Sequence, residues 1–348
     1  MPTDVFTDLF APVVSPHRWH PQFAELRGSA LHGEARALMN ALLHRMRDPN
    51  GNFVRHFQGD AFHSRLFELA CFAYLEHAGL TVDRSHAQPD FLASSEDLAL
   101  AIEAVTANPP GSQAADISLR QMAELSDAEI LEKVSCVFPR RINSILLRKL
   151  THNYHELPQC RDKPLVLMIA PFFEAGSVFY TDDALVHLFF GAPDGVNGIR
   201  PFFQRPEAGP VSAVLYCNQF TVTRFLRLAT DFTAESAPKV FRHGTCYLAR
   251  DDDYTLKDFR YRVGAGGTPK ETWADGVTIF ENPNARVPLP RNGLPGSSRV
   301  CIQDGYVYRE VRGFHPVVSF IEIRSEGDAA IDDGGLLTRD HAVREDTN

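Results

Sequence analysis

The sequence predicts an α/β protein in which a mixed central sheet is flanked by helices and is followed by a β-rich C-terminal extension. Three observations support this fold class. Apolar residues recur at helical spacing between residues 62 and 75, short strand-like segments follow, and a continuous apolar run, LVLMIAPFF, spans residues 165–173. With a second helical pattern before that run, the expected order is α–β–β–β–α–β, which is typical of helices packed on a mixed sheet.

The first helix of this order carries an acidic residue among apolar ones. Phe62, Leu66 and Leu69 mark its apolar face, and Gly79 is a natural C-terminal stop. Glu68 lies inside the helix with apolar neighbours on both sides, and a carboxylate buried there needs a partner or a metal ion. A preceding helix over residues 31–47 is expected to pack against it.

A β-hairpin is predicted after this helix. Residues 80–82 are a candidate strand, residues 89–92 and 98–106 read as two strands, and the polar residues 94–97 between them as a turn. Asp90 lies at the start of the first hairpin strand. Glu103 interrupts the otherwise apolar second strand.

The register of the hairpin decides whether these two acids meet. If the turn is centred between Ser95 and Glu96, Asp90 lies opposite Ala101, and Glu103 is its diagonal neighbour on the same face. Two carboxylates so placed can hold one cation. A slip of one residue would put them on opposite faces of the sheet.

A helix acid, then a Pro-Asp pair entering a hairpin, then an acid on the second strand resembles the core of the PD-(D/E)xK nuclease superfamily, also called restriction-endonuclease-like. The resemblance covers roughly residues 53–170. It implies that Asp90 and Glu103 bind Mg²⁺ or Mn²⁺ and that Glu68, the acid from the preceding helix, lies around the same metal ion. It also implies that the partner is nucleic acid, namely DNA. The main-chain carbonyl of Ala104 or Val105 is a further candidate ligand.

The sequence departs from the family pattern at one position. The superfamily has a lysine two positions after the strand acid, where this chain has Val105. Some members are similar in carrying that cation on a neighbouring helix, and Lys149, on a predicted helix over residues 140–150, is the candidate here. Arg141 and Arg148 are weaker candidates. The alternative is that these cations form the solvated face of an amphipathic helix.

The expected chemistry is hydrolysis of a phosphodiester. This reaction needs charge neutralisation on a non-bridging oxygen, an activated water and a stabilised leaving group, and carboxylate-bound Mg²⁺ can supply them. The catalytic set is therefore predicted to be Glu68, Asp90, Glu103 and Lys149. No GxSxG elbow, HExxH helix or CxxC pair supports a serine-hydrolase or zinc site.

Composition sets further bounds. The chain has 348 residues and is 44% hydrophobic, enough for a sizeable core. Its formal net charge of -9 is unlike that of a nonspecific nucleic-acid binder, so a nuclease of this charge needs a local basic patch or bound metal. With six scattered cysteines, no membrane-length apolar run and no secretory pattern at the N-terminus, we expect a cytoplasmic protein without a membrane partner.

Three parts of the chain are predicted. Residues 1–190 form the restriction-endonuclease-like α/β core with an N-terminal helical segment, residues 191–325 a β-rich extension packed on it, and residues 326–348 a disordered tail. Beyond residue 191, Pro and Gly become frequent between strand-like pieces. These pieces cover residues 244–249, 277–280, 305–311 and 317–323, whereas residues 211–217 are expected to supply a later strand of the mixed sheet.

Two rival hypotheses remain open at this stage. In the first, the same fold carries a degraded site that binds nucleic acid or a protein without cleaving it, which the missing motif lysine favours. In the second, an unrelated α/β protein carries the acids by chance. Glu68 then pairs with Arg65 or another neighbour, Asp90 caps a turn after Pro89, and Glu103 is a surface acid.

Overall fold

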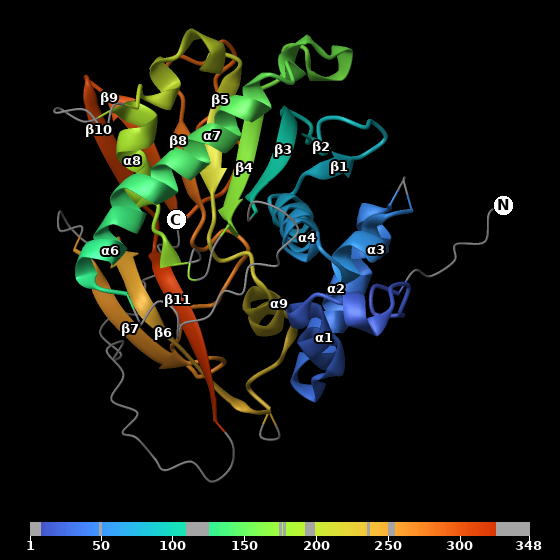
Figure 1. Ribbon diagram of the computed structural model, residues 1–348. Helices are drawn as coiled ribbons and strands as arrows, with labels where there is room; N and C mark the ends of the chain where they lie inside the picture. Colours follow the sequence, from blue (N-terminus) through green and yellow to red (C-terminus); the bar gives the residue numbers. More distant parts are fainter. Residues whose placement is uncertain are drawn as a thin grey trace.

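The central feature of the fold is an eight-stranded mixed sheet with the strand order β1-β2-β3-β4-β5-β8-β9-β10 (Figure 1). The computed structural model describes residues 8–48, 51–108, 125–173, 176, 179–191, 199–234, 237–249 and 255–324. Helices lie on both faces of the sheet, so the predicted α/β class and mixed central sheet are confirmed. The predicted tail, residues 326–348, lies outside the described residues.

Within residues 8–48 and 51–80, four α-helices precede the sheet; this region is blue in Figure 1. They are α1 (Pro21–Gly28), α2 (Gly33–Met46), α3 (Phe53–Gln58) and α4 (Phe62–His77). The helices predicted over residues 31–47 and from Phe62 are thus α2 and α4. Gly79 follows α4 with a φ of 76°, a left-handed conformation that favours glycine and ends the helix.

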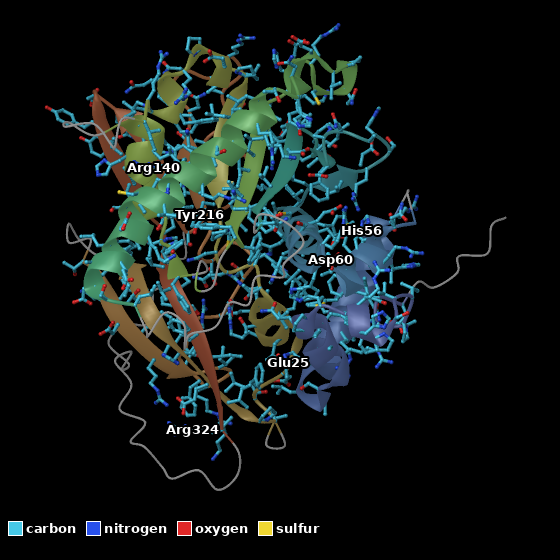
Figure 2. The ribbon with its side chains drawn as sticks, viewed as in Figure 1. Glu25, His56, Asp60, Arg140, Tyr216 and Arg324 are labelled. Atoms are coloured by element: carbon cyan, nitrogen blue, oxygen red, sulfur yellow. The ribbon has the colours of Figure 1, made fainter. Side chains whose placement is uncertain are left out.

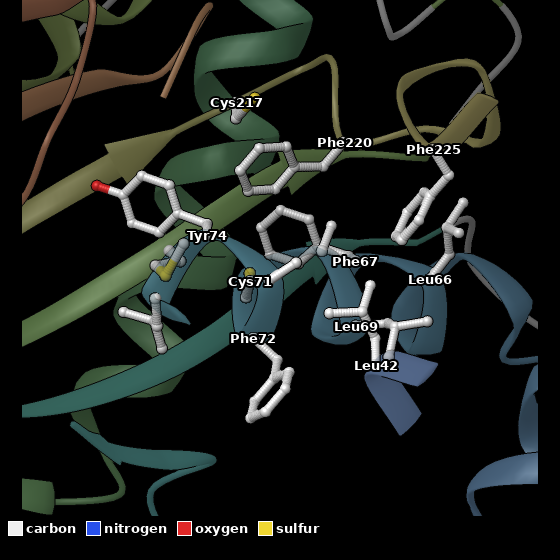
Figure 3. Packing of buried hydrophobic residues seen from close by; sticks show 14 of the residues in the cluster. Leu42, Leu66, Phe67, Leu69, Cys71, Phe72, Tyr74, Cys217, Phe220 and Phe225 are labelled. Carbon is white, nitrogen blue, oxygen red and sulfur yellow. The ribbon is translucent and has the colours of Figure 1, made fainter. Parts of the chain in front are cut away.

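Helix α4 lies in the middle of the larger hydrophobic core. Its side chains from Leu66 to Tyr74 pack against residues of other elements, including Phe220 and Phe225 (Figure 3). Nearly the whole circumference of α4 is buried, because α2 covers one side of it and the sheet covers the other. The rigid burial of α4 fixes the position of the polar side chains at its first turns.

The hairpin follows α4 as predicted, with β1 (Thr81–Asp83), β2 (Phe91–Ser94) and β3 (Ala99–Ala107). Its register differs from the predicted one by two residues. Leu92 pairs with Ala101 and Phe91 with Ile102, so the turn is centred between Glu96 and Asp97. A shift of two residues preserves the faces, and it places Asp90 level with Glu103 instead of with Ala101.

Strand β4 (Leu165–Pro171) runs parallel to β3, and β5 (Val211–Tyr216) runs parallel to β4. Between β3 and β4, α6 (Asp127–Glu132) and a short π-helical segment (Lys133–Val137) lead into α7 (Phe138–Leu150). Helix α7 crosses the face of the sheet opposite α4, beside α8 (Asp183–Phe190) (Figure 1). The side chain of Tyr216, labelled in Figure 2, is buried beneath this layer against Phe138.

The C-terminal part divides between two sheets. Strands β8 (Thr278–Glu281), β9 (Ser298–Gln303) and β10 (Tyr306–Val311) continue the central sheet beyond β5. Helix α9 (Val222–Ala229) follows β5. A separate three-stranded sheet contains β6 (Lys239–Leu248), β7 (Lys257–Arg262) and β11 (Phe314–Arg324), in the order β11-β6-β7. Strands of the region predicted as a β-rich extension therefore belong in part to the central sheet.

The cysteines and the helices bear on two further expectations. All six cysteines are described, and all six are free thiols. Among the helices that the structure describes, none combines the length and the apolar character needed to span a bilayer.

Candidate functional site

Asp90 and Glu103 converge where β2 begins and β3 passes it. The backbone N–H of Asp90 donates to Oε2 of Glu103 at 3.2 Å, and the N–H of Ala104 donates to Oδ2 of Asp90 at 2.9 Å. The parallel pairing with β4 holds Glu103 in register opposite Leu167, and only 6% of Glu103 is exposed. Two carboxylates thus share a largely buried position on one face of the hairpin.

Lys149 reaches these carboxylates from α7. Its Nζ donates to Oε1 of Glu103 at 2.6 Å. Val105, which stands where the superfamily has its lysine, is only 2% exposed and belongs to the apolar cluster between β3 and α7. Side chains two apart on a strand share a face, so Glu103 and Val105 both point to the α7 side. The cation of this site comes from that helix.

The electrostatics of the pair are unfavourable in the absence of a further cation. Burial raises the pKa of Asp90 to about 7, with further contributions from the charges of Glu103 and Glu68, while the Ala104 N–H and Lys149 oppose the shift. Burial also raises the pKa of Tyr154, whose phenol lies near Glu103. A buried carboxyl pair with one nearby lysine retains the capacity to bind a positive charge.

Glu68 is engaged differently. Arg65, one turn earlier on α4, and Arg84, just after β1, each donate to one of its carboxylate oxygens. The arginines are themselves held over aromatic rings, Arg65 at 5.6 Å from Phe53 and Arg84 at 5.3 Å from Phe91. Glu68 lines the same cavity as the acidic pair, but its charge is already balanced by two guanidinium groups.

A cavity of about 260 Å³ opens over the acidic pair. Polar side chains surround it: Ser64 Oγ lies 2.7 Å from Thr106 Oγ1, and Asn108 Nδ2 donates to Ser64 Oγ at 2.8 Å. Arg148, next to Lys149, also lines the cavity. Arg141 donates to the main-chain carbonyl of Asn108 and supports the rim.

Several of these residues carry no clear signal in the sequence. Ser64, Thr106 and Asn108 flank the helix acid and the strand acid, but small polar residues are too common for position alone to mark them. Arg84 follows β1 by one residue, and only the folded hairpin brings it to Glu68. Arg65 was foreseen only as a partner of Glu68, which is the contact it makes.

The residues present can hold a metal ion, but with two carboxylates and not three. No group of three or more His, Cys, Asp and Glu residues in the described ranges is arranged as a metal site. Mg²⁺ is commonly bound by one or two carboxylates together with waters and substrate phosphates. The N–H and C=O of a strand residue point to the same side. The Ala104 carbonyl therefore points toward the Asp90 side, where its N–H donates, so Asp90, Glu103 and Ala104 fit such a site.

The site is thus a largely buried pair of carboxylates, Asp90 and Glu103, with the ammonium group of Lys149 on one side. Comparisons with protein-family models, with curated proteins and with solved structures give no significant match. The class of the protein must therefore be argued from its own residues.

Proposed function

We propose that this protein is a metal-dependent phosphodiesterase acting on nucleic acid, with DNA as the substrate. The observation that carries the proposal is the convergence of Asp90, Glu103 and Lys149 at one cavity. Two acids and a lysine are the set that PD-(D/E)xK nucleases use. Here Lys149 reaches the site from α7, because Val105 replaces the lysine on the strand.

We further propose that residues 53–170 form a restriction-endonuclease-like core. Supporting this, α4, the β1–β2–β3 meander, α7 and β4 follow one another in the order expected for that core. Helices α4 and α7 cover opposite faces of these strands. The remaining strands of the central sheet, from β5 onward, are additions to this core.

In the proposed site, Asp90, Glu103 and the Ala104 carbonyl hold Mg²⁺ or Mn²⁺. When bound, the metal supplies Lewis-acid stabilisation of the charge that develops on the phosphate. Lys149 orients the attacking water beside Glu103 and adds a positive charge near the scissile phosphate. Arg148 and the hydroxyl and amide groups of Ser64 and Asn108 contact the phosphates on either side.

Glu68 has a supporting role in this scheme. Its two ion pairs hold Arg84 and also Arg65, which lines the cavity. The local positive charge of Arg65, Arg148 and Lys149 offsets the acidic character of the chain where a phosphate would approach. Glu68 thus positions cations, and the metal is assigned to the Asp90–Glu103 pair.

The proposal is tested by incubating plasmid and single-stranded DNA with the intact protein and Mg²⁺ or Mn²⁺. We expect metal-dependent cleavage that is lost in Asp90→Ala and in Lys149→Ala. Arg140→Ala is the matched control, because Arg140 is an exposed cation on the same helix as Lys149, away from the cavity (Figure 2). Equal loss of activity in Arg140→Ala would refute a specific role for Lys149.

A second candidate function is a binding module that holds nucleic acid without cleaving it. The neutralisation of Glu68 by two arginines favours it, because only two acids remain for the metal. The two candidates differ in one assay: the module binds DNA with unchanged affinity after Asp90→Ala and never cleaves it. Binding without cleavage by the folded protein, with either metal, would select this alternative.

A further inference from the structure

A second and larger cavity lies on the other side of α4. Its volume is about 370 Å³, within the range of small-molecule sites. Residues of α1, α4, α9, β6 and β11 line it, together with His32, which precedes α2, and residues that follow β4 and β5. Glu25, labelled on α1 in Figure 2, is one of them. None of the residues of the acidic site lines this cavity.

Aromatic rings form much of its wall. Phe320 of β11 lies 4.6 Å from Phe179 and 5.5 Å from His243, measured between ring centroids. Phe172, after β4, stacks on His63 of α4 at 4.9 Å. Rings that line a cavity favour a flat, aromatic ligand, because its face can stack on them. Such stacking is tolerant of the identity of the ligand ring.

One end of the cavity carries a buried positive charge. Arg227 of α9, which lines the cavity, forms a bidentate pair with Glu271 at 2.7 and 2.9 Å. The same carboxylate also forms ion pairs with Arg224, at 3.1 Å, and with Arg242, at 3.5 Å. Even with the nearby Asp275 counted as ionised, three guanidinium groups face two carboxylates, so the cluster holds a surplus positive charge.

Arg227 has a donor left for a ligand. Its Nε and Nη2 are used by Glu271, and Nη1 makes no hydrogen bond within the part of the chain that is described. Burial and the neighbouring arginines lower the pKa of Arg227, which means that its charge is incompletely compensated. A guanidinium in this state is suited to a phosphate or carboxylate.

Polar groups between the two ends complete the site. Ser319 accepts a hydrogen bond from Arg242 at 2.7 Å and retains its own hydroxyl proton for donation. Asn218 donates its amide to two main-chain carbonyls, at 3.1 Å each, which fixes its carboxamide oxygen as an acceptor. Both residues line the cavity. The combination of rings, a donor, an acceptor and a buried cation is more specific than an apolar void.

We propose that this cavity binds a nucleotide, with the phosphate on Arg227 and the base against Phe320 and His243. A nucleoside monophosphate has a planar heterocycle, which can stack on the aromatic rings, and a small anion, which can bind Arg227. The site is separate from the acidic cavity and does not depend on it.

Two kinds of ligand carry both a base and a phosphate and can be distinguished by experiment. Ser64 and Arg65 of α4 line the acidic cavity, and the adjacent His63 lines the second one. The ligand is therefore either a free mononucleotide or the terminal nucleotide of a strand held at the acidic site. The second source rests on the proposed nuclease function, whereas the first does not.

Titration calorimetry of the intact protein with the four nucleoside 5′-monophosphates tests the proposal. We expect saturable binding of at least one, and weaker binding of the matching nucleoside and of inorganic phosphate. Asp90→Ala should bind it equally well, so failure of the nuclease assay leaves this result intact. A 5′-phosphorylated oligonucleotide that displaces the mononucleotide indicates a strand end, and failure to displace it indicates a free nucleotide.

A charge variant with a matched control makes the test specific. Thr223 of α9 lines the cavity and lies outside the arginine cluster. Thr223→Glu should weaken nucleotide binding by about tenfold or more, because it places a negative charge beside the bound anion. Thr223→Gln should not, because Gln has the shape of Glu without its charge. Phe320→Ala should also weaken it, and Ile323→Ala, farther along β11 outside the cavity, should not.

Two results would overturn the proposal. One is the absence of saturable binding of any monophosphate to the folded protein at millimolar concentration. The other is binding that Thr223→Glu and Phe320→Ala leave unchanged, which would place the nucleotide elsewhere. Thermal unfolding of each variant verifies that a loss of binding does not reflect a loss of fold.

Discussion

Lys149 and Glu103 are 46 positions apart in the chain, yet Nζ of the lysine lies 2.6 Å from Oε1 of the glutamate. Helix α7 makes this contact possible because its apolar side packs on the β3–β4 face and directs Lys149 at the strand. The lysine also opposes the negative charge of Asp90, whose carboxyl is buried beside Glu103. We therefore expect the Lys149–Glu103 ion pair to contribute both to the stability of the fold and to the proposed cleavage reaction.

Lys149→Met should separate these two effects. Removing the cation leaves a buried carboxylate unpaired, so we expect the free energy of unfolding to fall by about 3 kcal/mol. Cleavage should fall by about 10²-fold, the usual loss for one electrostatic stabiliser. Denaturant unfolding and a plasmid assay measure the two quantities.

Adding Glu103→Gln to Lys149→Met is the informative control. The double variant should recover part of the stability, because the unpaired charge of Glu103 is removed while Asp90 remains, but it should not recover cleavage. Arg140→Met should change neither quantity. If Lys149→Met proved as stable as the wild type, the Lys149–Glu103 contact would be absent in solution.

The pH dependence of metal binding follows from Asp90. Its pKa is raised from 3.8 to about 7, so between these values the folded state binds more protons than the unfolded state. The stability that the protonated carboxyl provides is complete below about pH 4 and is lost as the pH rises through about 7. Metal binding requires the ionised form and should therefore increase over the same interval.

Thermal unfolding with and without Mg²⁺ or Mn²⁺ measures this coupling. The increase in Tm on adding metal should be larger at about pH 8 than at about pH 6, and Asp90→Asn should abolish it. Without metal, Asp90→Asn should be more stable than the wild type at the higher pH. A metal-induced increase in Tm that is equal at both pH values would contradict the assignment of Asp90 as a ligand.

Glu68→Gln distinguishes a positioning role from a metal-binding one. The substitution breaks two largely buried ion pairs, with Arg65 and Arg84, and should lower the free energy of unfolding by about 3 kcal/mol. It should nevertheless preserve the metal-induced increase in Tm, because the metal is assigned to Asp90 and Glu103. Loss of that increase in folded Glu68→Gln would instead make Glu68 a ligand.

The part of the fold that the sequence predicted well is the part with simple periodicity. Helix α4 has a regular helical period, β4 is a short continuous apolar run that follows Pro164, and the turn before β3 is polar and short. The prediction that Asp90 and Glu103 share a face of the sheet followed from this, although the predicted turn centre was one residue too early. That error shifts the strand pairing by two residues, so every side chain stays on its predicted face.

Two charge-rich elements, α9 and β7, were missed. Helix α9 has an apolar stripe of Val222, Phe225, Leu226 and Ala229, but it is only eight residues long, and it also buries Arg224 and Arg227. Strand β7 alternates charged residues with Phe259 and Tyr261, a strand pattern that its many charges obscured. In both, the partner that neutralises the charge is distant in sequence, and only the folded chain supplies it.

For the arginines of α9 this partner is Glu271, and its burial gives a further prediction. Arg227, Arg242 and Arg224 hold the pKa of Glu271 well below its usual value of 4.5, against the opposing effect of burial. A depressed pKa contributes stability that is fully present above pH 4.5 and is lost as the pH falls toward the folded-state pKa. Glu271→Gln should therefore cost about 4 kcal/mol near neutral pH, because it leaves three buried guanidinium groups without their shared carboxylate.

The pH profile identifies the origin of this loss. Denaturant unfolding of wild type and Glu271→Gln should show a difference in unfolding free energy that is constant between about pH 6 and 8. This difference should narrow below pH 4.5, because the carboxyl of the unfolded wild type then takes up a proton while that of the folded state does not. Glu310→Gln is the control: Glu310 pairs with Arg291 and Arg312 at the surface and should contribute about 0.5 kcal/mol or less. If the two variants were equally stable at neutral pH, the buried arginines would not depend on Glu271, and the charge surplus beside the second cavity would need another explanation.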